Sequence, residues 1–128
     1  MPAQLKSHTQ GATLILTLSN PEYRNALGPE MYIAGIEALN AAVAGLPADR
    51  MRLHICWGNY EAPHQMDVPL ADIVDVVCQA RPQAVSFEAA NPRHAHEWTV
   101  FETYKLPEGK VIIPGVLESK SNFIEHPE

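Results

Sequence analysis

Residues 51–59 read Met51-Arg-Leu-His-Ile-Cys-Trp-Gly-Asn59, an apolar run that sets the first strand of a repeating pattern. Side chains alternate between the two faces of a strand, so His54 and Cys56 share one face while Leu53 and Ile55 point to the other. Imidazole nitrogen and thiolate sulfur are preferred zinc ligands. The pair therefore predicts either half of a zinc site or a buried thiol beside a hydrogen-bonded histidine.

The following segments alternate in type. Apolar residues at helical spacing predict a helix over residues 69–80, and Ala84–Glu88 is a short β-branched and aromatic run typical of a strand. Asn91-Pro92 predicts a second helix that reaches about residue 104, and a further strand is expected over residues 110–115. This order favours an α/β fold with a helix-covered parallel sheet.

Parallel sheets gather their chemistry at the carboxyl ends of the strands. His54 and Cys56 lie at that end of the first strand, and Glu88 is the last residue of the second. A carboxylate oxygen is a third type of zinc ligand. We therefore expect Glu88 to be a candidate third ligand.

Three motifs carry a family resemblance: Arg52-Leu-His-Ile-Cys-Trp-Gly-Asn-Tyr60, Ser86-Phe-Glu-Ala-Ala-Asn-Pro-Arg-His-Ala-His-Glu-Trp98 and Ile113-Pro-Gly-Val116. With these motifs, about residues 38–128 resemble the cobalamin-independent methionine synthase family. The resemblance implies a partial (β/α)₈ barrel and a zinc-dependent S-methyltransferase of methionine biosynthesis. In that family a methyl group passes from a methylated folate to the thiol of homocysteine.

By position, the resemblance implies that His54, Cys56 and Glu88 are the metal ligands, with zinc as the cofactor. The family's fourth ligand is a cysteine on a later strand, which we expect beyond the end of this sequence. Cys78 is instead expected to be a small core residue of the helix over residues 69–80.

Two residues are predicted to contact substrate. Glu118 stands where relatives tend to carry aspartate, and its extra methylene moves the carboxylate. His94 is interpreted either as a contact to substrate carboxylate or folate, or as a helix residue that supports the site. His64 and Asp67 belong to a polar loop that is expected to be solvated or to touch substrate.

The first third of the chain has a different pattern. A strand from about Gly11, a turn and an apolar-striped helix over residues 29–42 are expected. With Asn20-Pro-Glu-Tyr-Arg-Asn-Ala-Leu27, residues 8–42 resemble the amino-terminal part of the enoyl-CoA hydratase (crotonase) superfamily, without its catalytic machinery.

We therefore predict two units, residues 1–42 and residues 43–128, in a chimeric or truncated chain. Two alternatives to the methyltransferase remain open: a truncated enoyl-CoA hydratase or isomerase, and a non-enzymatic chimeric fragment. A complete barrel takes about 250 residues, whereas this chain has 128. We expect open sheet edges and self-association through them.

The charge composition excludes some classes of binding partner. The net charge is −6 and the nine lysines and arginines are scattered, which argues against nucleic acid and anionic membranes as partners. No membrane span or signal peptide is expected. Two cysteines, one of them ligand-like, favour a reducing cytoplasmic location over a disulfide framework.

Overall fold

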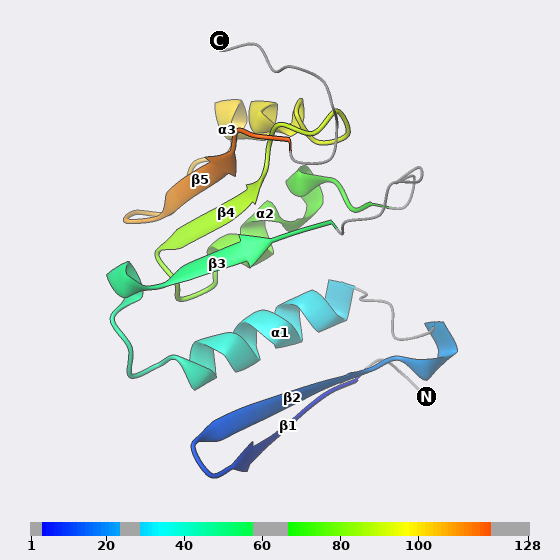
Figure 1. Ribbon diagram of the computed structural model, residues 1–128, viewed down its shortest axis with the longest axis vertical. Helices are drawn as coiled ribbons and strands as arrows, with labels where there is room; N and C mark the ends of the chain where they lie inside the picture. The colour runs from blue at the N-terminus through cyan, green and yellow to red at the C-terminus, as the bar shows by residue number, and fades with distance from the viewer. Residues whose placement is uncertain (1–3, 24–28, 58–66, 119–128) are drawn as a thin grey trace.

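The structure, a computed structural model, describes residues 4–23, 29–57 and 67–118 and is a mixed α/β fold with two separate sheets (Figure 1). The first sheet is an antiparallel hairpin of β1 (Gln4–Gln10) and β2 (Thr13–Ser19). Its turn contains Gly11 at φ 62°, a left-handed conformation that glycine adopts without steric cost. The strand β1 was not among the elements expected from the sequence.

The second sheet is parallel and has the order β3-β4-β5. Its strands are β3 (Arg52–Ile55), β4 (Ala84–Glu88) and β5 (Val111–Gly115), and α2 (Leu70–Cys78) connects the first two. The predicted alternation of strand and helix is thus confirmed over this part of the chain. The described residues form an open sheet and no closed barrel, with β3 and β5 at the two edges.

The core lies on one face of this sheet. Buried side chains of α2 pack against the inward residues of β4, Val85 and Phe87, which are both 4% exposed. Leu53 and Ile55 of β3 add to the same layer. Figure 1 shows α2 and α3 on this side of the sheet. The opposite face, which carries His54, has no helix over it in the figure.

The helix expected from residue 91 to about residue 104 is much shorter in the structure. Turns occupy residues 91–96 and are followed by a 3₁₀ turn (Glu97–Thr99) and by α3 (Val100–Thr103). The Asn91 side-chain Oδ1 accepts hydrogen bonds from the backbone amides of Arg93 and His94. These are the bonds of a helix N-cap, but the turn that follows continues through i to i+3 bonds, from the Glu97 amide to the His94 carbonyl and from the Thr99 amide to the His96 carbonyl, and α3 begins only at Val100.

Helix α1 (Pro29–Ala42) lies between the two sheets in Figure 1 and confirms the helix expected there. Asn40 links it to the parallel sheet's layer: its Nδ2 donates to the Gln79 carbonyl at 2.9 Å, and its Oδ1 accepts from the Arg81 amide. The division at residue 42 predicted from the sequence stays a prediction. Among the described helices, none has the length and apolar character needed to cross a membrane.

Candidate metal centre

The predicted ligands lie on the helix-free face of the parallel sheet. His54 pairs in register with Ser86, and Ile55 pairs with Phe87. Because side chains alternate along each strand, His54, Cys56, Ser86 and Glu88 all lie opposite the core face. The contacts of His54 with Ser86 and of Cys56 with Glu88 are consistent with this placement, and the metal-ligand roles of these residues stay predictions.

Cys56 and Glu88 meet at the carboxyl ends of β3 and β4. Cys56 is exposed, and its Sγ lies 4.0 Å from Glu88 Oε1. The other carboxylate oxygen, Oε2, accepts a 2.8 Å hydrogen bond from Asn91 Nδ2. Asn91 is itself fixed, because its Oδ1 accepts from the amides of Arg93 and His94. The arrangement holds the far oxygen of Glu88 and directs the near oxygen to the thiol.

His54 contacts a serine. Its Nδ1 lies 2.9 Å from Ser86 Oγ, and Ser86 Oγ also lies 3.5 Å from the Leu53 carbonyl oxygen, to which only a hydroxyl proton can be donated. A hydroxyl group can donate one proton and can also accept, so this contact forms either with Ser86 as the donor to Nδ1 or with Nδ1–H as the donor to Ser86.

The nitrogen, sulfur and oxygen donors of His54, Cys56 and Glu88 are types that bind zinc, but only Cys56 and Glu88 are in contact. In residues 4–23, 29–57 and 67–118, no three His, Cys, Asp or Glu side chains come close enough together to hold a metal ion. For a tetrahedral site, the usual Zn–S and Zn–O lengths place sulfur and oxygen about 3.6 Å apart. The 4.0 Å between Cys56 Sγ and Glu88 Oε1 is near that spacing. Cys56 and Glu88, two of the three predicted ligands, are therefore close together, whereas the His54 ring contacts Ser86.

His94 is an internal residue. It is 5% exposed, its Nε2 lies 3.0 Å from Asp67 Oδ2, and its Nδ1 lies 3.0 Å from Glu97 Oε2. Both ring nitrogens thus lie within hydrogen-bond distance of a carboxylate oxygen, and the ring forms an ion pair with both carboxylates when it is protonated. Trp57 stacks on this ring at a centroid distance of 4.3 Å. The substrate contact predicted for His94 stays a prediction, and in this structure both ring nitrogens contact protein carboxylates.

This cluster joins three segments of chain. Glu97 Oε1 accepts from the Leu70 amide at the start of α2, and Trp57 Nε1 donates to the Val68 carbonyl at 2.7 Å. The end of β3, the start of α2 and the turn at residues 91–97 are thereby held together. Since the turn includes Asn91, the cluster also supports the residue that orients Glu88.

The other predicted residues are dispersed. Glu118 is half-buried three residues after β5, and its substrate contact stays a prediction. Cys78 is 6% exposed and belongs to the core, as expected from the sequence. His64 lies outside the described residues.

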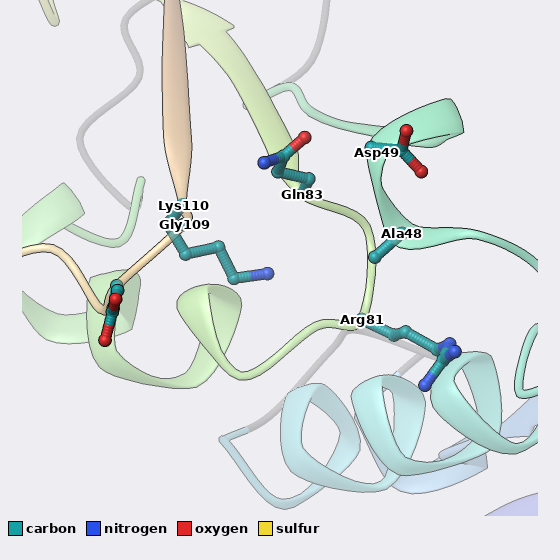
Figure 2. A pocket seen from close by; sticks show the side chains of 7 residues that line it. Ala48, Asp49, Arg81, Gln83, Gly109 and Lys110 are labelled. Carbon is teal, nitrogen blue, oxygen red and sulfur yellow. The ribbon is translucent and has the colours of Figure 1, made fainter.

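A hollow of about 370 Å³ opens at the other end of the sheet (Figure 2). Its lining comes from segments that precede β3, β4 and β5: Ala48, Asp49, Arg81, Gln83, Glu108, Gly109 and Lys110. Lys110 Nζ donates to the carbonyls of Ala80 and Pro82, and burial lowers the pKa of Lys110. Arg81 donates to the Leu46 carbonyl at 3.2 Å. Both cations thus tie loops together at the amino ends of the strands, away from the candidate metal centre.

Reasoning from sequence did not find Ser86 and Asn91 as partners of the ligands, nor Glu97 as a partner of His94. Ser86 had a usable signal, because it precedes Glu88 by two residues and must share its face in a strand. Asn91 and Glu97 had no such signal, because they lie in turns whose geometry depends on contacts with distant residues.

Comparison with known proteins gives no further constraint. No family model, no curated protein and no solved structure matches this chain. The geometry of its own residues is therefore the evidence for the candidate metal centre.

Proposed function

We propose that the chain carries the zinc-binding segment of a partial (β/α)₈ barrel and acts in methyl transfer to a thiol, as in the cobalamin-independent methionine synthase family. The observation that carries the proposal is the 4.0 Å approach of Cys56 Sγ to Glu88 Oε1 on the helix-free face. In a (β/α)₈ barrel the helices lie outside and the opposite face of each strand lines the interior. The face that carries His54, Cys56 and Glu88 corresponds to that interior.

The roles of the residues follow from their chemistry. His54, Cys56 and Glu88 would hold the ion through one nitrogen, one sulfur and one oxygen. When bound there, zinc lowers the pKa of a substrate thiol, so that the thiol reacts as a thiolate near neutral pH. Asn91 fixes the Glu88 carboxylate through its 2.8 Å hydrogen bond and thereby limits where the substrate sulfur lies.

We take homocysteine as the thiol and a methylated folate as the methyl donor. The thiol loses its proton to solvent, and its sulfur forms a bond to the methyl carbon as the bond between that carbon and the folate nitrogen breaks. The folate nitrogen then takes up a proton. The side chains on the open face position the thiolate and do not carry this proton.

Zinc content of the purified full chain tests the proposal. After exposure to zinc and dialysis, we expect near-stoichiometric zinc in the unaltered protein and its loss in Cys56→Ser. Cys78→Ala is the matched control, because Cys78 is buried in the core and should leave the zinc content unchanged. Homocysteine should then perturb the absorption of the cobalt-substituted protein. Absence of zinc in the unaltered chain, or its retention in Cys56→Ser, contradicts the proposal.

The hairpin and α1 favour a second reading for the first unit alone. An antiparallel hairpin, separate from the parallel sheet and followed by a helix, is consistent with the crotonase-like origin inferred for residues 1–42. Under this reading the first unit adds no catalytic group. If the chain is a non-enzymatic chimera, neither zinc nor homocysteine binds in the experiment above.

A further inference from the structure

We propose that the hollow at the amino ends of the parallel strands binds a small molecule through a singly charged carboxylate group. The ammonium of Lys110 would hold that group, with the side-chain amide of Gln83 as a second donor. Both residues line the hollow, whose volume of about 370 Å³ suits a small ligand. The site is separate from the candidate metal centre, and the inference does not depend on the proposed methyl transfer.

Lys110 carries a positive charge that no carboxylate of the described residues contacts. Its Nζ donates hydrogen bonds to two neutral groups, the carbonyls of Ala80 and Pro82. The side chain is half-buried, and this burial lowers the pKa of Lys110, because an ammonium that is partly withdrawn from water is less stable. A charge that leaves water is normally compensated by an opposite charge. A bound anion would supply that compensation here.

Hydrogen-bond donors remain available in the hollow. An ammonium has three protons, so one proton of Lys110 is left after its two carbonyl bonds. The backbone of Gln83 bonds to Ala48 and Val111, whereas no described residue forms a hydrogen bond with its side-chain amide. Two donors beside one hollow match the two oxygens of a carboxylate.

The arrangement of the lining favours a single negative charge. Figure 2 shows the Lys110 side chain reaching into the space before β4, with Ala48 across from it, while the side chains of Asp49 and Arg81 extend away from that space. With Glu108, the lining contains two acidic and two basic side chains. A doubly charged phosphate would meet more repulsion from the two acidic side chains than a carboxylate does.

The experiment titrates the ¹⁵N-labelled full chain with sodium acetate and follows the backbone amide signals of Gln83, Gly109 and Lys110. Acetamide is the matched ligand control, because it has the shape of acetate without its charge, and sodium chloride keeps the ionic strength equal. We expect saturable shifts with acetate at millimolar concentrations, as its few atoms allow, and none with acetamide. Inorganic phosphate should bind more weakly than acetate.

Three variants locate the binding group. Lys110→Met keeps the length of the side chain without its charge and should weaken acetate binding about ten-fold or more. Lys105→Met makes the same change of net charge at an exposed lysine outside the hollow, and it should bind acetate as the unaltered protein does. Gln83→Glu leaves the loop bonds of Lys110 in place, and its own carboxylate should occupy the site and abolish acetate binding.

The outcomes that overturn the inference are distinct. Absence of saturable shifts with acetate in the unaltered chain overturns it, and so do equal shifts with acetamide. Acetate binding that Gln83→Glu leaves unchanged contradicts the assigned position, even where Lys110→Met fails to fold. Tighter binding of phosphate than of acetate overturns the assignment to a carboxylate. Zinc content tests the proposed function separately and is unaffected by any of these results.

Discussion

Replacement of His94 by phenylalanine tests the internal cluster that supports the candidate metal centre. The aromatic ring can remain stacked on Trp57, while both hydrogen-bond donors to Asp67 and Glu97 are lost. The change therefore removes the polar ring atoms and leaves their two carboxylate partners in place. Stability, rather than metal binding, is the first quantity that it should alter.

The structure gives the size of the effect. Each hydrogen bond to a charged group contributes about 1.5–3 kcal/mol. The Glu97 side chain is 11% exposed and the Asp67 side chain 19%, so water can partly replace the lost donor, more readily at Asp67. Glu97 also keeps its bond from the Leu70 amide. We expect a loss of about 3–4 kcal/mol, within the range for removing one partner of a buried ion pair.

Urea unfolding followed by circular dichroism measures this loss at pH 7. Fluorescence is less suitable because the stacked Trp57 reports the substitution itself. His96→Phe is the matched control: His96 is exposed in the same turn, and its substitution should change the free energy of unfolding by less than about 0.5 kcal/mol. A loss below about 1 kcal/mol in His94→Phe, or one equal to the control, would refute the ionic character assigned to the cluster.

Two further predictions concern β5 and the core. Gly115 pairs with Glu88, and a Cβ added to it would lie 3.3 Å from the Phe87 carbonyl oxygen. This overpacking should cost about 1 kcal/mol of folding free energy, so Gly115→Ala should lower the thermal midpoint. The control Gly45→Ala should not lower the midpoint, because an added Cβ there has nothing within 4 Å. Burial, with nearby Cys78 and Asp75, raises the pKa of Tyr104 to about 12, so the folded state retains a proton that the unfolded chain loses near pH 10.0. The free energy of unfolding should therefore fall as the pH rises from about 10 to 12, and urea unfolding should show a smaller fall in Tyr104→Phe than in the unaltered protein. An equal fall in the two proteins contradicts the raised pKa of Tyr104.

Local pattern predicted the parallel unit well. The apolar spacing of residues 69–80 corresponds to α2, and Ala84–Glu88 is β4 with the bounds expected from the sequence. Both elements have a hydrophobic period that their own residues set, because each buries one side against the same core. The predicted length of the helix after Asn91 was wrong, because residues 94–99 close through i to i+3 bonds while His94 and Glu97 contact each other and His94 also contacts Asp67.

For the candidate site, the sequence by itself determined that His54 and Cys56 share a face, because strand alternation is a property of the local backbone. Only the tertiary structure decided that Cys56 lies beside Glu88, 32 residues away, and that Ser86 lies beside His54. It also decided that His94 faces inward between two carboxylates. Register between strands and the burial of a turn depend on packing between distant segments, and no single segment encodes them.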